Sequence, residues 1–200
     1  MTRESVDERA LEKPDIIDRK QPPGGVPFLP FQVSAGQDVP DFLPIGAKTP
    51  VRQTSSTHGA NGYITIDQTE ISRTLQRLKS KLESSVAQFS FYDLLPAEKS
   101  ETLLISYGVT ARACKAVYKE LQNTAQPVSL LILKTLWPVP VDVIRRGAEG
   151  FKRTVVVEMN LGQYVGEIKR ILTDRRVDFY GQMDGRLITP FQIKETIINA

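Results

Sequence analysis

Short, predominantly apolar runs in the second half of the chain constrain its fold most. They are residues 102–107, 128–133 and 154–157, and a shorter candidate follows at 177–180. Each run is followed by a stretch whose apolar residues recur at helical spacing. Strands that are apolar throughout are buried on both faces, and their alternation with helices is typical of a mostly parallel sheet. We therefore predict an α/β domain over residues 100–200, a three-layer sandwich with right-handed crossovers.

The segments between these runs predict the helices of the domain. One helix has an apolar face made by Ala113, Ala116, Val117 and Leu121, and we expect Thr110 to cap it. The other helices are expected from their apolar stripes at Pro140 to Gly147, Tyr164 to Leu172 and Pro190 to Ile197.

Proline dominates the first part of the chain. The first 50 residues hold eight of the 13 prolines, which excludes regular helix and central strand there. Too many apolar residues accompany them for a free linker: Val26, Phe28, Leu29, Phe31, Phe42 and Leu43. We predict that residues 1–66 form an extended proline- and glycine-rich arm over this domain, a second copy or another subunit. A disordered tail is the alternative.

A linker helix region is predicted at residues 67–99. Asp67 and Glu70 are spaced as in a capping box. Apolar residues then recur at helical spacing: Ile71, Leu75, Leu78 and Leu82. The basic residues between them indicate a solvated face more than an anion-binding surface.

Composition excludes several functional classes. Cys114 is the only cysteine and His58 the only histidine, so one copy holds no disulfide framework, no cysteine-ligated iron–sulfur cluster and no multi-histidine zinc site. We expect no metal site here, and Cys114 as a packed thiol. The net charge of +3 is too small to imply nucleic acid. The apolar runs are far shorter than the roughly 20 residues of a membrane span, and Met1 to Arg9 lack a secretory signal, so we expect a cytoplasmic protein without membrane partner.

Motifs of common active sites are also missing from the sequence. It contains no GxxxxGK[ST] phosphate loop, no GxGxxG after a strand and no GxSxG nucleophile elbow. We therefore predict no catalytic residue in this chain.

Turns after the predicted strands are where such a fold meets ligands or partners. After the third strand, Glu158, Asn160, Gly162 and Gln163 combine a carboxylate, two amides and a glycine at the start of a helix. Asn160 is expected to cap that helix, Gly162 to allow close backbone approach, and Glu158 to accept hydrogen bonds from loop amides. This arrangement favours a structural role. The alternative is an interface or ligand role for the four residues of this turn, in which Gln163 could form hydrogen bonds across a subunit boundary.

Two further residues are candidate interface or binding residues. Trp137 stands between a strand and two prolines, where it is expected to be a packing anchor; if exposed, it would indicate a subunit contact. His58 lies in a loop, residues 57–62, before a strand-like segment at 63–66. A hydrogen-bonded loop residue is the favoured interpretation, and a proton shuttle the alternative.

Three strings together resemble a known family. They are Leu103-Leu104-Ile105-Ser106-Tyr107-Gly108, Leu133-Lys134-Thr135-Leu136-Trp137-Pro138-Val139-Pro140 and Val155-Val156-Val157-Glu158-Met159-Asn160-Leu161-Gly162-Gln163. In this order they look like the C-terminal part of the α subunit of 2-oxoacid:ferredoxin oxidoreductases, with the 2-oxoglutarate type the most similar. The loop around His58 resembles that family's histidine-containing loop, which often has an acidic residue where Gly59 stands.

The resemblance implies a transketolase C-terminal-like domain and a noncatalytic role as subunit or fragment. The implied complex oxidises a 2-oxoacid with coenzyme A to an acyl-CoA, carbon dioxide and reduced ferredoxin. Thiamine diphosphate, Mg²⁺ and iron–sulfur clusters would lie in partner chains: a pyrimidine-domain chain, a β subunit and optional γ and ferredoxin-like subunits. The alternatives are an autonomous α/β module for a nucleotide or coenzyme A, and the C-terminal domain of another thiamine-dependent dehydrogenase or synthase.

Overall fold

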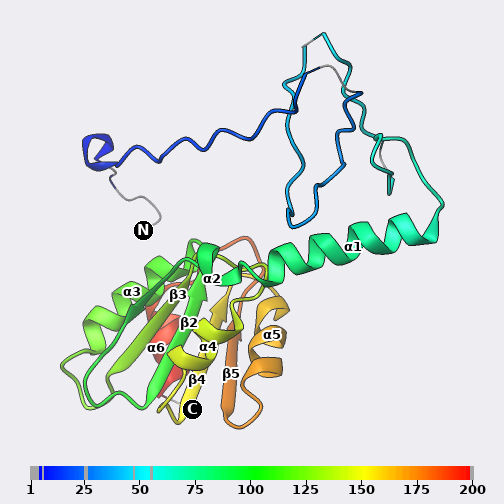
Figure 1. Cartoon of the computed structure of the whole chain (residues 1–200). Coiled ribbons are helices and arrows are strands. Elements are labelled where there is room, and N and C mark those ends of the chain that lie inside the picture. The colour runs from blue at the N-terminus through cyan, green and yellow to red at the C-terminus, as the bar shows by residue number, and fades with distance from the viewer. Residues whose placement is uncertain (1–4, 6, 25–26, 47, 55, 199–200) are drawn as a thin grey trace. The chain divides into compact units, whose positions relative to one another are not determined.

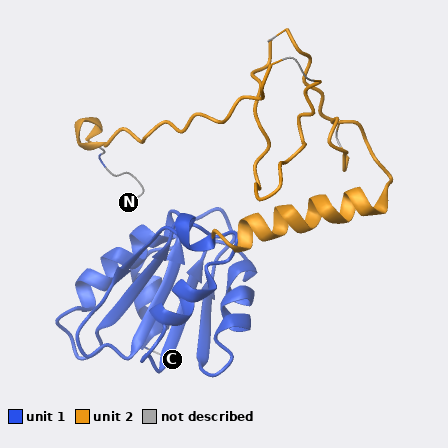
Figure 2. Ribbon diagram, viewed as in Figure 1, with its two compact units in different colours: residues 1–5, 86–200 blue, residues 6–85 orange. Residues whose placement is uncertain are grey.

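The computed structural model describes residues 5, 7–24, 27–46, 48–54 and 56–198. Contacts divide the chain into two compact units, which Figure 2 colours separately: unit 1 is Met1–Ser5 with Val86–Ala200, and unit 2 is Val6–Ser85. Val26, counted above among the apolar residues of the arm, lies outside the described residues.

Unit 1 is built on a five-stranded sheet with the order β1-β3-β2-β4-β5 (Figure 1). Four of its strands are mutually parallel: β2 (Thr102–Tyr107), β3 (Val128–Leu133), β4 (Arg153–Glu158) and β5 (Arg176–Gly181). The predicted α/β fold with a mostly parallel sheet is confirmed.

Sequence analysis missed the fifth strand. β1 (Tyr92–Leu95) follows the one-turn helix α2 (Val86–Phe89) and pairs antiparallel with β3. Only one of its edges is bonded, and its residues are exposed or half-buried. An edge strand of four residues therefore leaves no apolar run in the sequence.

Helices cover both faces of the sheet, so the three layers are confirmed. α3 (Thr110–Leu121) and α6 (Pro190–Ile198) share one core with the sheet, and α4 (Val141–Gly147) and α5 (Gln163–Ile171) share the other (Figure 1). Thr110 does not cap α3: it is the first helical residue and buried, and Val109 holds the cap position without a side-chain hydrogen bond.

Side chains of the central strand β2 point alternately to the two faces of the sheet and so contribute to both cores. Leu103 and Ile105 of β2 pack toward α4 and α5, whereas Leu104 between them packs toward α3 and α6. All three are fully buried. Each such side chain stabilises the fold by about 1.5–3 kcal/mol, which is why this strand is apolar at every one of these positions.

Unit 2 holds a short 3₁₀ helix η1 (Glu8–Ala10), an extended arm and helix α1 (Gln68–Glu83). The predicted cap of α1 is confirmed, because the Asp67 carboxylate accepts a 2.8 Å hydrogen bond from the Glu70 N–H. The helix has no buried residue, and its leucine stripe is exposed: Leu75, Leu78 and Leu82. Every buried apolar side chain of the described residues belongs to unit 1.

Over the same residues, no helix has both the length and the apolar character that membrane crossing requires.

We expect a chain that begins at Val86 to unfold as cooperatively as the full chain, because both cores lie within residues 86–198. The free energies of unfolding, measured by urea denaturation, should differ by less than about 0.5 kcal/mol. Loss of the cooperative transition in the truncated chain would contradict this division.

Candidate functional site: the carboxyl edge of the sheet

The buried carboxylate of Glu158 organises the end of β4. It is 1% exposed and accepts hydrogen bonds from the backbone N–H groups of Tyr164 (3.1 Å) and Val165 (2.9 Å). The Tyr107 hydroxyl (2.7 Å) and the Asn160 side-chain amide (2.9 Å) donate to the same carboxylate. Its predicted role as acceptor of loop amides is confirmed. The first turn of a helix favours negative charge, so this group stabilises the start of α5.

Asn160 completes the cap of α5. Its Oδ1 accepts hydrogen bonds from the N–H groups of Gly162 (2.8 Å) and Gln163 (2.9 Å), and its Nδ2 also donates to the Tyr107 hydroxyl (2.8 Å). The predicted capping role is confirmed, although the residue at the cap position itself is Gly162. With the two bonds to Glu158, the N–H groups of the cap residue Gly162 and of the first three residues of α5 all have side-chain acceptors.

Glycine is required at two points of this edge. Gly162 has a φ of +98°, in the left-handed region that favours glycine. The close approach expected at Gly162 occurs at Gly181 of β5, where a Cβ atom would lie 2.5 Å from the carbonyl oxygen of Asn160. The end of β5 and the turn after β4 therefore touch through their backbones.

Trp137 is not a packing anchor. Its side chain is 75% exposed, so the interpretation as a buried anchor is wrong. Its turn is nevertheless tied to the site, because the Tyr164 hydroxyl donates a 3.2 Å hydrogen bond to the carbonyl of Leu136. A subunit contact through Trp137 stays a prediction. Gln163, in the first turn of α5, is also exposed.

Cys114 is a packed thiol, as predicted. It is fully buried in the α3–α6 core. Burial raises the pKa of the thiol to about 12, which removes the thiolate needed for nucleophilic or metal-binding chemistry near neutral pH.

His58 belongs to unit 2. Its ring lies 3.8 Å from that of Phe31, centroid to centroid, and its Nδ1 is buried without a hydrogen-bond partner among the described residues. The loop is held by its backbone instead, with a 2.9 Å hydrogen bond from the Gly59 N–H to the Tyr63 carbonyl. A Cβ atom at Gly59 would lie 2.9 Å from a carboxylate oxygen of Glu70, so that carboxylate occupies the space of an acidic side chain at position 59.

Tyr107 is the residue of this site that sequence reasoning did not single out. It ends β2, next to β4 in the sheet, and that placement brings its hydroxyl to Glu158. Burial and the hydrogen bond to Glu158 raise the pKa of Tyr107 above its ordinary value. Only its position as the last residue of an apolar run could have indicated the role.

The crevice where an open α/β sheet binds ligands is filled by these side chains. α3 leaves β2 toward one face and α5 leaves β4 toward the other, which makes the gap between the ends of β2 and β4 the switch point of the sheet. Tyr107, Glu158 and Asn160 bond to one another there. The amides of α5 that could bind a phosphate are already bonded within the chain. The arrangement therefore holds a turn rigid and offers no phosphate cradle at this point.

We expect Glu158→Gln to lower the free energy of unfolding by about 2 kcal/mol, because the amide places N–H donors where the carboxylate accepts four hydrogen bonds. Glu167→Gln is the matched control, since Glu167 makes a partly exposed pair with Arg170 and should change little. Thermal and urea unfolding measure both. Equal effects of the two substitutions would contradict the role of Glu158.

Alkaline pH should destabilise unit 1 through its buried phenols. Burial, with the charges of Glu167 and Glu158, raises the pKa of Tyr164 to about 12, against about 10 in an unfolded chain. The resulting stabilisation is complete below pH 10 and is lost as the pH rises toward 12. Tyr164→Phe should flatten this decline in unfolding free energy, followed by circular dichroism. The control Tyr92→Phe, at a 43% exposed position, should preserve it. An unchanged decline in Tyr164→Phe would exclude this cause.

The amino-acid sequence of this chain is similar to those of several known proteins. Residues 100–193 match the family model described as pyruvate:ferredoxin oxidoreductase core domain II. A 2-oxoglutarate synthase subunit KorA of Methanothermobacter thermautotrophicus is 30% identical over 174 residues, 86% of this chain and 46% of the relative. A ketoisovalerate oxidoreductase subunit VorB of the same species is 28% identical over 123 residues, 62% of this chain and 34% of the relative. The chain spans about half the length of the KorA relatives it matches.

A solved structure shares the fold. It is the 2-oxoglutarate:ferredoxin oxidoreductase from Magnetococcus marinus with 2-oxoglutarate, coenzyme A and succinyl-CoA bound, with a TM-score of 0.74 and 19% identity. The match covers 92% of this chain and 32% of that one. The resemblance found in the sequence is confirmed: residues 100–193 belong to the core domain II of the 2-oxoacid:ferredoxin oxidoreductase family.

Proposed function

We propose that this chain is a noncatalytic part of a thiamine-diphosphate-dependent 2-oxoacid:ferredoxin oxidoreductase of the 2-oxoglutarate type. The complex converts a 2-oxoacid and coenzyme A to an acyl-CoA and carbon dioxide, and passes the electrons to ferredoxin. The match of residues 100–193 to core domain II carries the proposal. The KorA relatives support the choice of 2-oxoglutarate.

The residues of this chain do not fit the cofactors of such a complex. Over the part of the chain that the structure describes, no group of three or more His, Cys, Asp or Glu side chains could hold a metal ion. The sole cysteine is a buried thiol and cannot supply the four thiolates of an iron–sulfur cluster. We propose that thiamine diphosphate, Mg²⁺ and the clusters are held by partner chains and that the complex is cytoplasmic, and we derive no catalytic step from this chain.

The role that remains is assembly. Unit 1 is a rigid domain whose exposed Trp137 and Gln163 are available for contact with another subunit. The arm of residues 1–66, including His58, and the helix of region 67–99 bury no apolar side chain within the described residues. We propose that both cover a partner surface, because apolar residues held in an extended segment gain stability only by contact with one.

The crevice between β2 and β4 is filled by side chains of the chain itself. This argues against the alternative function, an autonomous module that binds a nucleotide or coenzyme A at the switch point. A ligand phosphate there would have to displace the Glu158 carboxylate from the N–H groups of Tyr164 and Val165.

The purified chain alone should not reduce a viologen dye with 2-oxoglutarate, coenzyme A and thiamine diphosphate, whereas the complex that contains it should. Within that complex, 2-oxoglutarate should be turned over faster than 3-methyl-2-oxobutanoate, the substrate type named by the VorB relative. Turnover by the homogeneous chain would refute the noncatalytic role. A complex without any 2-oxoacid oxidation would refute membership in such an enzyme.

A further inference from the structure

The exposed apolar side chains of unit 1 gather at one edge of its sheet. The turns and helix starts at the carboxyl ends of the parallel strands carry six of them: Val109 (40% exposed), Trp137 (75%), Leu161 (82%), Met183 (68%), Leu187 (44%) and Phe191 (68%). They follow four different strands, so no single loop accounts for them. Exposed apolar side chains gathered on one face mark interaction sites on folded proteins.

The opposite edge of the same sheet has a different surface. Its turns are residues 96–101, 122–127, 148–152 and 173–175, and none of them holds a large apolar side chain that is exposed. Their exposed residues include several charged ones: Glu98, Lys99, Glu149, Lys152 and Asp174. The turns of the amino edge therefore expose charged side chains without large apolar ones, whereas the turns of the carboxyl edge expose both kinds.

The apolar residues of the carboxyl edge lie close enough for one interface. Along this edge the strand order is β3-β2-β4-β5, and neighbouring strands are about 4.8 Å apart. Trp137 follows β3 and Met183 follows β5, so three strand spacings, about 14 Å, separate the strands that bear them. A standard interface of about 800 Å² per partner spans such a row. Trp is also the residue type that most often dominates binding energy.

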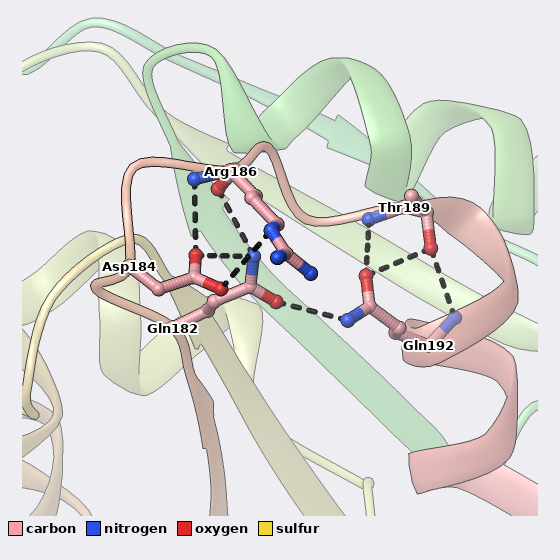
Figure 3. Close-up of polar contacts among 5 residues, drawn as sticks. All are labelled: Gln182, Asp184, Arg186, Thr189 and Gln192. Atoms are coloured by element: carbon pink, nitrogen blue, oxygen red, sulfur yellow. Dashed lines mark hydrogen bonds and ion pairs between the residues drawn. The ribbon is translucent and has the colours of Figure 1, made fainter.

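The loop of residues 182–189 on this edge is held in shape by its own polar groups (Figure 3). The side-chain amide of Gln182 donates to the Asp184 carboxylate (3.0 Å) and to the carbonyl of Arg186 (3.0 Å). The amide of Gln192 at the start of α6 donates to the Gln182 side-chain oxygen (2.9 Å). These bonds fix the loop, in which Ile188 is buried while Met183 and Leu187 remain exposed. An ordered loop loses little entropy on binding.

A hollow of about 450 Å³ lies beside this row, between α3 and the ends of β1 and β3. Lys115, Lys134 and Asp93 are among its lining residues, and Asp93 pairs with Lys134 at 2.5 Å. Lys115 adds a further positive charge beside this pair. A partner surface with carboxylates is complementary to it.

The chain itself enters unit 1 at this edge. Tyr92 pairs with Leu133, the last residue of β3, and the Phe91 carbonyl accepts a 2.9 Å hydrogen bond from the Lys134 N–H. Residues 86–91 therefore lie at the carboxyl edge. The KorA relatives are about twice as long as the segment they share with this chain.

We propose that the carboxyl edge of unit 1 is the docking face for the domain that these relatives carry outside the shared segment. That domain presents an apolar surface to Trp137, Leu161 and the 182–189 loop, and carboxylates to the cations of the hollow. The inference rests on the proposed function and names the surface through which this chain joins the enzyme. Here that domain belongs to a companion chain.

Hydroxyl-radical footprinting of the native complex tests the face. The complex is purified through a tag on the full chain, and its companion is identified by mass spectrometry as the counterpart of the remaining half of KorA. Oxidation of Trp137, the only tryptophan of the chain, and of Met183 should fall at least tenfold relative to the isolated chain. Tyr118, on α3, should be oxidised equally in both. Equal oxidation of Trp137 and Met183 in the two samples would overturn the proposal.

Matched substitutions provide the second measurement. Leu161→Ser and Trp137→Ala should each weaken the affinity for the companion at least tenfold, measured as the dissociation constant. Leu94→Ser is the control, because Leu94 is 43% exposed on β1 and away from this edge. It should change the affinity less than twofold. Thermal melting of the isolated variants identifies any that fail to fold, and for those Leu187→Ser, at a 44% exposed position, is the substitute. Equal affinities of all variants for the companion would show that the carboxyl edge is not the docking face.

The experiments distinguish an error in the proposed docking face from an error in the proposed function. If the complex oxidises 2-oxoglutarate but protection falls on the amino edge, the face is wrong and the proposed function stands. If the tagged chain forms no complex and no 2-oxoacid is oxidised, both are wrong. If Trp137 and Met183 become protected in the isolated chain as its mass doubles with concentration, the occupant is a second copy and the companion domain is excluded.

Discussion

The buried carboxylate of Glu158 is the group on which the carboxyl edge of this domain depends. It joins β4 to the first turn of α5 through two backbone N–H groups and to β2 through the Tyr107 hydroxyl. Through Tyr164 the same network reaches the turn that carries Trp137. A buried charge is tolerated only when every bond it needs is made, so Glu158 and its donors hold three turns in one arrangement.

In this arrangement the domain differs from open α/β domains of similar topology that bind a ligand at the switch point. The switch point and the helix start, which elsewhere receive a phosphate, are occupied by the chain's own side chains. The polar groups around the switch point are thus bonded within the chain, and the apolar side chains exposed at this edge include Trp137, Leu161 and Met183. A filled crevice and exposed apolar side chains at the same edge are suited to association with protein, which accords with the proposed noncatalytic role in a larger oxidoreductase.

The two units differ in what stabilises them. Unit 1 contains two apolar cores, one on each face of its sheet. Unit 2 contains a capped helix with exposed leucines and a proline-rich arm held by scattered hydrogen bonds, such as that from Arg77 to the carbonyl of Asp38. An isolated helix of this length is marginal in water, so unit 2 depends on contact with other protein surface to a degree that unit 1 does not.

The sequence by itself determined the elements of unit 1 and the order of its layers, because strands buried on both faces must be apolar throughout and helices on them must be amphipathic. It also indicated that Glu158 and Asn160 serve the start of α5, since capping is a local interaction within a few residues. Strand β1 was decided only by tertiary structure, because a half-exposed edge strand has no apolar signature. So were the exposure of Trp137 and the bond of Tyr107 to Glu158, 51 residues away. Both depend on which strands become neighbours, and a parallel sheet sets that by crossovers that no local pattern encodes.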